Sequence, residues 1–164
     1  MSRDPQELIA ALQTLPWFQE IEPRHFDSLC GIASLKEVNA GEELFREGDK
    51  EDYLYVVLEG RIAVEIFVPG HGRQRIFTAE PMDVVGWSSV TPVVRQRTAS
   101  ARAVLPGRLI LLDAPKLRQL CEEDHDLGYV VMRRLANVVA SRLLVTRLQL
   151  LDMFARPSKE TAND

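Results

Sequence analysis

The sequence predicts an α+β fold: an antiparallel β-roll (a jelly-roll-like, double-stranded β-helix) between N-terminal helices and a long C-terminal helix. Three observations indicate it: helical apolar spacing over residues 4–32, short β-rich runs over 34–112, and helical spacing again over 114–154. Turns separate the β-rich runs at intervals of about ten residues, which is typical of antiparallel sheets and not of βαβ units. We expect one domain over residues 1–156 and a polar tail over 157–164.

The N-terminal segment contains two expected helices. Asp4 is suited to cap a helix that starts at Pro5, and Leu8 and Leu12 lie on one side of it. A second helix is expected from Pro23 to Ile32.

The pattern changes to strands at Ser34. "YLYVVLEGRIAVEIF" predicts two β-rich runs hinged at Gly60, and "VPGHG" predicts a hairpin turn before the strand "RQRIFTA". "RTASARAV" and "RLILL" predict two further strands, separated by a turn at Pro106 and Gly107.

Two helices are expected after the roll, a short one through Cys121 and a long one over residues 126–154. The long helix is apolar on most of its sides, so most of its sides must be covered. We expect the same helix of a second subunit to cover one side, giving a homodimer with Leu135 and Val138 in the interface. The alternative is a helix buried wholly within its own domain.

Composition excludes several classes of protein. A net charge of −4 provides no general attraction to nucleic acid or to anionic membranes, and no apolar run is long enough for a membrane span. The start of the chain does not resemble a signal peptide, so we expect a cytoplasmic protein. Cys30 and Cys121 are expected to be reduced core residues.

Several glycines and their neighbours carry a family resemblance: "AGEELFREGD", "LYVVLEGRIAV", and "DVVG" ending at Gly86, with Arg97 eleven residues later. The chain resembles the cyclic-nucleotide-binding domain of the bacterial catabolite-activator and fumarate-nitrate-regulator (Crp/Fnr-like) superfamily. The resemblance implies a non-catalytic sensor in signal transduction that binds a cyclic nucleotide, cAMP or cGMP, or a related anion. It also implies an unknown downstream protein partner. Because the chain stops soon after the long helix, no helix-turn-helix and no direct DNA binding are expected.

The stretch after Gly86 corresponds to the family's phosphate-binding cassette. A short helix starting there points backbone N–H groups toward an anion, and an arginine guanidinium meets a phosphate in bidentate fashion. We expect Arg97 at the mouth of the pocket, so that its removal changes stability little. The candidate cassette residues are Gly86, Trp87, Ser88, Ser89, Arg97 and Thr98.

Departures from the family pattern leave the ligand open. Trp87 replaces the usual glutamate that accepts a ribose hydroxyl, and an indole cannot accept that hydrogen bond. Val138 and Val139 occupy the positions of hydroxyl residues that reach the base. The resemblance also places Val64 and Ile76 in the pocket wall, and Arg134 and Val138 on the ligand side of the long helix.

Two alternatives to a nucleotide sensor are kept. One is a ligand-free interaction domain in which Trp87 fills the pocket and Arg134 lies over its ring. The other is a haem-binding sensor that uses His71 or His125. We expect no catalytic residues, no metal site and no required cofactor, because no nucleophile or metal-ligand motif is present and two cysteines cannot hold a four-cysteine cluster.

Overall fold

The computed structural model describes residues 4–50, 52–91, 93–94 and 96–155. The polar tail expected over residues 157–164 lies outside them. The elements in chain order are α1 (Pro5–Gln13), the 3-10 helix η1 (Pro16–Glu20), α2 (Pro23–Ile32), β1 (Ala33–Val38), β2 (Glu43–Phe45), β3 (Tyr53–Val68), β4 (Gly72–Ala79), β5 (Val84–Val85), the 3-10 helix η2 (Trp87–Val90), β6 (Ser100–Asp113), α3 (Ala114–Glu123) and α4 (His125–Ala155).

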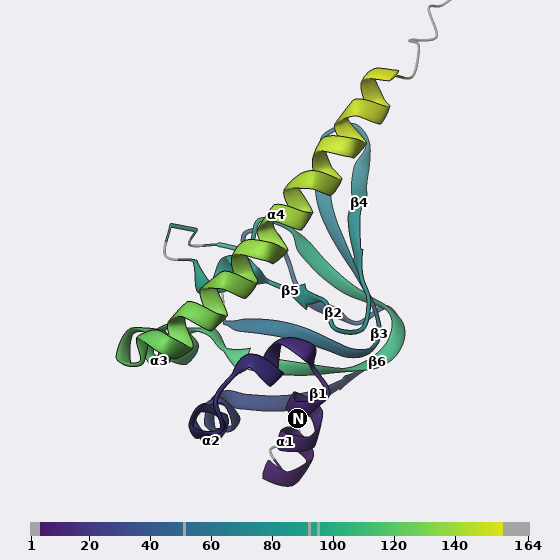
Figure 1. Ribbon diagram of the computed structural model, residues 1–164. Coiled ribbons are helices and arrows are strands. Elements are labelled where there is room, and N and C mark those ends of the chain that lie inside the picture. The colour runs from purple at the N-terminus through teal and green to yellow at the C-terminus, as the bar shows by residue number, and fades with distance from the viewer. Residues whose placement is uncertain (1–3, 51, 92, 95, 156–164) are drawn as a thin grey trace, which may run out of the picture.

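The strands form an antiparallel sheet that confirms the predicted fold class. The main strand order is β1-β6-β3-β4, with β2 paired to β6 and β5 paired to β3. All these pairings are antiparallel. In Figure 1 the N-terminal helices and β1 lie at one end of this sheet, while α4 runs diagonally past the other strands. Asp4 caps α1 as predicted, its carboxylate accepting a hydrogen bond from the Gln6 amide.

The two long strands differ from the sequence prediction. The runs on either side of Gly60 form one strand, β3, and the runs on either side of Pro106 and Gly107 form one strand, β6. The pairing register between β3 and β6 shifts three times between Val57 and Ile62. A Cβ on Gly107 would lie 2.0 Å from the Glu59 carbonyl oxygen, so the two backbones cross too closely for a side chain. The glycines therefore mark a bend that both paired strands share, not two turns.

Two apolar clusters form the core. The larger lies between the helices and one face of the sheet, and includes Leu12, Phe18, Leu54 and Leu127. The smaller lies inside the roll and includes Val57, Ile62 and Leu109.

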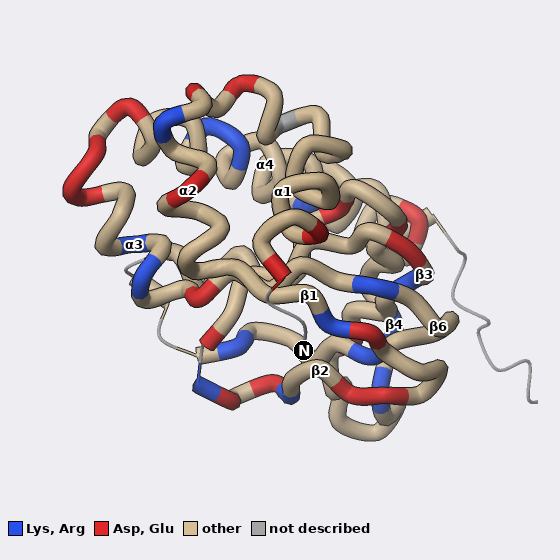
Figure 2. The backbone as a smooth tube through the Cα atoms, turned by 90° about the horizontal axis from the view of Figure 1, so that it is seen from below, with Lys and Arg blue, Asp and Glu red and all other residues tan. Residues whose placement is uncertain are grey.

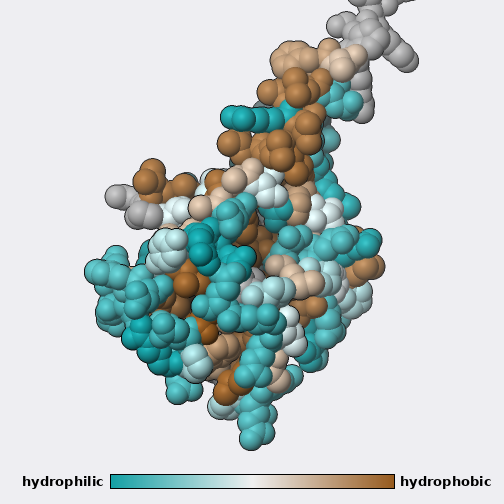
Figure 3. Space-filling model, in the orientation of Figure 1, coloured by the Kyte–Doolittle hydropathy of each residue, from teal (hydrophilic) through white to brown (hydrophobic). Residues whose placement is uncertain are grey.

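Helix α4 is buried only near its start. Leu127, Val131 and Leu135 pack in the larger core cluster. Leu135 is 5% exposed, so the prediction that it lies in a subunit interface is wrong: its own chain covers it. Beyond this point α4 runs alongside the hairpin of β3 and β4 (Figure 1), and apolar side chains gather on the outer part of the helix (Figure 3). The Gln149 side chain donates a 3.0 Å hydrogen bond to the Ile76 carbonyl, which ties this end to β4.

The molecular surface mixes both signs of charge. Basic and acidic segments are interspersed over the face seen in Figure 2. Arg133 and Arg134 on α4 both form ion pairs with Glu20. In the part of the chain that the structure describes, no helix combines the length and the apolar character that a membrane crossing requires.

Candidate ligand-binding site

Residues 86–89, hereafter the cassette, consist of Gly86, which directly follows β5, and the first three residues of η2. Gly86 has φ +80°, in the left-handed region that favours glycine. A Cβ at this position would lie 2.4 Å from Nη1 of Arg97. The glycine is thus required both by the backbone angle and by the arginine packed against it.

Arg97 lies beneath the cassette and is 3% exposed. Its guanidinium donates hydrogen bonds to the carbonyl oxygens of Gly86 at 3.1 Å and Tyr53 at 2.6 Å. The guanidinium carbon also lies 4.2 Å from the centre of the Phe45 ring. The expected position of Arg97 at the pocket mouth is therefore wrong. Its hydrogen bonds to backbone carbonyls hold the cassette against β3.

Ser89 is buried as well, at 0% exposure. Its hydroxyl donates to the Gly86 carbonyl at 2.7 Å, and its backbone N–H donates to the same carbonyl at 3.1 Å. This N–H closes the turn and is not available to an anion. Of the three cassette amides that the sequence suggests as anion donors, those of Trp87 and Ser88 remain candidates.

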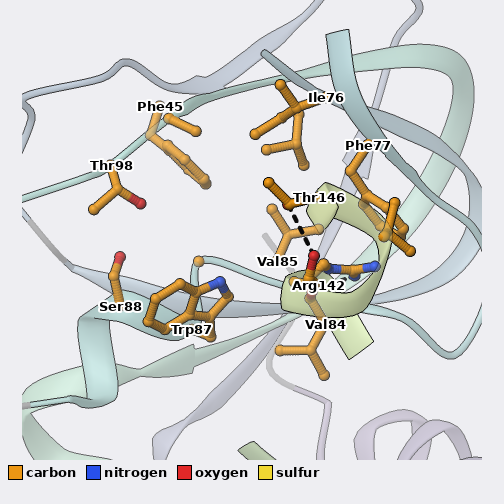
Figure 4. A pocket seen from close by; sticks show the side chains of 14 residues that line it. Phe45, Ile76, Phe77, Val84, Val85, Trp87, Ser88, Thr98, Arg142 and Thr146 are labelled. Atoms are coloured by element: carbon orange, nitrogen blue, oxygen red, sulfur yellow. Dashed lines mark hydrogen bonds between the residues drawn. The ribbon is translucent and has the colours of Figure 1, made fainter. Parts of the chain in front are cut away.

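A cavity of about 190 Å³, the first cavity, lies between the cassette, the roll and α4 (Figure 4). Trp87, Ser88 and Thr98 lie on one side of it in Figure 4, and Arg142 lies on the other beside Phe77. Its lining residues are Phe45, Val64, Ile76, Phe77, Val84, Val85, Gly86, Trp87, Ser88, Thr98, Ala99, Arg142, Val145 and Thr146. The structure thus gathers Gly86, Trp87, Ser88, Thr98, Val64 and Ile76 from the sequence prediction around one space.

Two other predicted site residues, Arg134 and Val138, line a different space. This second cavity, of about 240 Å³, lies between α4 and the segment 82–84. The Arg134 guanidinium bonds to Glu20, so the expected stacking of Arg134 on Trp87 does not occur. Helix residues that face the first cavity lie further along α4, at Arg142, Val145 and Thr146.

Arg142 is a functional candidate that is absent from the site residues predicted from the sequence. Its guanidinium carbon lies 3.0 Å from the centre of the Phe77 ring, and Nη2 lies 3.4 Å from the Val84 carbonyl oxygen. Burial lowers the pKa of Arg142 from its usual value, and the nearby Asp83 carboxylate opposes this shift. The spacing of 142, 145, 146 and 149 places these residues on one helix face, a signal that the sequence does contain.

The remaining polar candidates lie away from the first cavity. His71 is in the turn between β3 and β4, and His125 begins α4. Among the described residues no group of three or more His, Cys, Asp and Glu side chains is placed to hold a metal ion.

Cys30 and Cys121 are free thiols, and burial raises the pKa of Cys121 to about 11. These cysteines are therefore poor nucleophiles near neutral pH.

A family model for the cyclic nucleotide-binding domain matches residues 35–124, which is more than half of the chain. The chain belongs to this family. The match runs from β1 to the end of α3 and includes the cassette, but not α4.

This cyclic nucleotide-binding domain is similar to several known proteins. A CRP-like cAMP-activated global transcriptional regulator of Mycobacterium tuberculosis is 27% identical over 137 residues, covering 83% of this chain and 58% of the relative. The domain thus spans less than two thirds of that relative. The solved structure of a cyclic nucleotide-binding domain from Methylobacillus flagellatus is 25% identical, with a TM-score of 0.75 and coverage of 91% of this chain and 83% of that one.

A catabolite activator protein of Thermus thermophilus shares the fold. Its structure has a TM-score of 0.66 at 24% identity, and the match covers 85% of this chain and 63% of that one.

Proposed function

We propose that this chain is a non-catalytic regulatory module that binds a cyclic nucleotide or a related small anion in the first cavity. The observation that carries the proposal is the position of this cavity, which the cassette bounds on one side and α4 on another. A ligand here contacts both, so that its binding is coupled to the position of the helix. Family membership and the name of the cAMP-activated Mycobacterium tuberculosis relative support the same ligand class.

Each part of the cavity has a role in this proposal. The hydroxyls of Ser88 and Thr98 and the amides of Trp87 and Ser88 supply polar contacts. Val64 and Ile76 supply apolar wall. Arg97 acts indirectly, because it keeps Gly86 and the cassette in place. Trp87 provides a ring face for stacking but no acceptor for a ribose hydroxyl, so recognition of the sugar differs from the family pattern.

The proposed output runs through α4 and a homodimer formed by its outer part, since the first part of the expected interface over residues 126–154 is buried in its own chain. Leu144, Leu148 and Leu151, hereafter the outer stripe, follow one another at helical spacing and are 59, 57 and 63% exposed. Apolar side chains exposed in a continuous stripe mark an interaction surface. In the proposal the outer stripe of a second copy covers them, and the dimer passes the signal to a downstream protein.

A ligand-free interaction domain is the second candidate, and one observation favours it. The first cavity, at about 190 Å³, is smaller than the roughly 300–1,000 Å³ of most ligand sites. Half-buried Trp87 occupies part of its wall and packs against the larger core cluster. In this case Trp87 replaces a ligand and the fold serves only to present α4.

Thermal unfolding with added ligands separates these candidates. A cyclic nucleotide at about 100 times its dissociation constant stabilises the folded state by about 2.7 kcal/mol. For a chain of this size that raises the melting temperature by roughly 5–10 °C. The control is sodium phosphate at the same ionic strength. Melting temperatures that do not respond to cAMP, cGMP, cyclic dinucleotides or common anionic metabolites would favour the ligand-free domain.

A further inference from the structure

The arginines near the two cavities differ in how far hydrogen bonds and ion pairs within the protein already occupy their guanidinium groups. Arg134 lines the second cavity, but its guanidinium is paired with the Glu20 carboxylate. Arg97 lies beneath the cassette, bonds to two backbone carbonyls, and is not among the residues that line the first cavity. Neither guanidinium is placed to meet an anion in the first cavity.

Arg142 has the opposite arrangement. It is half-buried and lines both cavities, together with Val84. Among the described residues, Arg142 forms no ion pair, because no Asp or Glu oxygen lies within 4.0 Å of its side-chain nitrogens. The contact of its Nη2 to the Val84 carbonyl oxygen is long, at 3.4 Å. Stacking on Phe77 fixes the guanidinium plane at the cavity wall without using its N–H donors.

A charge held in this way favours an anionic partner. Burial has removed part of the water from the guanidinium and lowers the pKa of Arg142, and the nearby Asp83 carboxylate, which forms no ion pair with it, offsets that loss only in part. The rest of the cavity lining is mostly apolar, with Phe45, Val64, Ile76 and Val145 around the space. A ligand that fits both features carries an anionic group at one end and an aromatic or aliphatic body.

We infer that Arg142 is the residue that binds the ligand's anionic group, so that the ligand's charge faces α4 and its apolar body faces Val64, Ile76 and Trp87. The inference rests on the proposed function and deepens it, because it assigns the charge recognition to the helix and not to the cassette. The ligand class is a small phosphate ester or carboxylate with an apolar body. Because the anion then contacts α4 directly, it acts on the helix that bears the outer stripe.

The test is calorimetric titration of the full chain with three probes: cAMP, its uncharged counterpart adenosine, and octanoate. Arg142→Gln removes the charge and leaves a polar but shorter side chain. We expect it to weaken cAMP binding at least about tenfold, since a charge-assisted hydrogen bond contributes that much to affinity. Adenosine binding is expected to be unchanged in the same variant. Arg142→Lys keeps the charge and should retain most of the cAMP affinity.

The matched control is Arg147→Gln on the same helix, because Arg147 is exposed and does not line either cavity. It should bind cAMP like the wild type, and circular dichroism should show that all variants are folded. If the wild type binds cAMP and Arg142→Gln binds it equally well, the inference is wrong while the proposed function stands. If octanoate binds in an Arg142-dependent way and no cyclic nucleotide binds, the inference stands and the nucleotide assignment fails. If none of the three probes binds the wild type, both fail.

Discussion

Replacing Arg97 by alanine is expected to destabilise the protein by about 2–4 kcal/mol, because the change removes two charge-assisted hydrogen bonds and leaves a space in the core. The lost bonds are those to the carbonyls of Gly86 and Tyr53, and the space opens beside the Phe45 ring. For a chain of this length the melting temperature should fall by roughly 5–15 °C. Differential scanning calorimetry without ligand measures the effect.

Two further variants make the Arg97 experiment specific. Arg97→Lys keeps a positive charge but cannot reach both carbonyls in the same geometry, so its melting temperature should lie between those of the wild type and Arg97→Ala. Arg75→Ala removes an exposed arginine from β4 and should change stability by no more than about 0.5 kcal/mol. An Arg97→Ala protein that melts like the wild type would show that the buried guanidinium does not support the cassette.

Charged residues in the outer stripe are expected to convert the proposed dimer into monomers. The double substitution Leu144→Glu and Leu148→Glu places two carboxylates on a surface that the proposal buries between identical helices, where like charges repel and lose water. Both leucines are more than half exposed in the single chain, so the fold of each protomer should be retained. Light scattering after size exclusion should report half the mass of the wild type.

Arg75→Glu is the control for this experiment, since it makes the same change of net charge at an exposed position on β4. It should leave the mass unchanged. A wild type that is already monomeric at the highest concentrations measured, or a double variant that remains dimeric, would rule out the outer stripe as the interface. Substitution at Leu135 is not a suitable test, because that residue belongs to the core of its own chain.

Local patterns were sufficient to predict the order of the elements. The capping residue Asp4, the change from helical to alternating spacing at Ser34 and the long apolar pattern after residue 125 each depend on neighbouring residues alone. The bend of β3 and β6 was not predictable in this way. Gly60 and Gly107 look like turn residues in sequence, and only their packing against each other shows that the strands continue through them.

The sequence indicated where the first cavity lies, but only part of what lines it. The family resemblance, carried in part by the spacing from Gly86 to Arg97, located the candidate cassette, and the Val64 and Ile76 that it implied as wall residues do line the first cavity. The direction of the Arg97 side chain depends on carbonyls at Gly86 and Tyr53, the second of which is 44 residues away in the chain. Arg142 was missed because its role depends on where α4 crosses the roll, about one helical turn beyond the expected Val138.

The most direct test of ligand binding in the first cavity is a calorimetric titration of cAMP and cGMP into the wild type and Thr146→Trp. Thr146 lines the cavity from an exposed position on α4, so that an indole there fills the space without entering the core. Arg147→Trp is the control, at the next residue and outside the cavity lining. We predict that the wild type and Arg147→Trp bind one of these nucleotides at one site per chain, and that Thr146→Trp binds it at least about tenfold more weakly, having lost more than about 1.4 kcal/mol. Absence of binding to the wild type, or equal affinity in Thr146→Trp, would contradict the account.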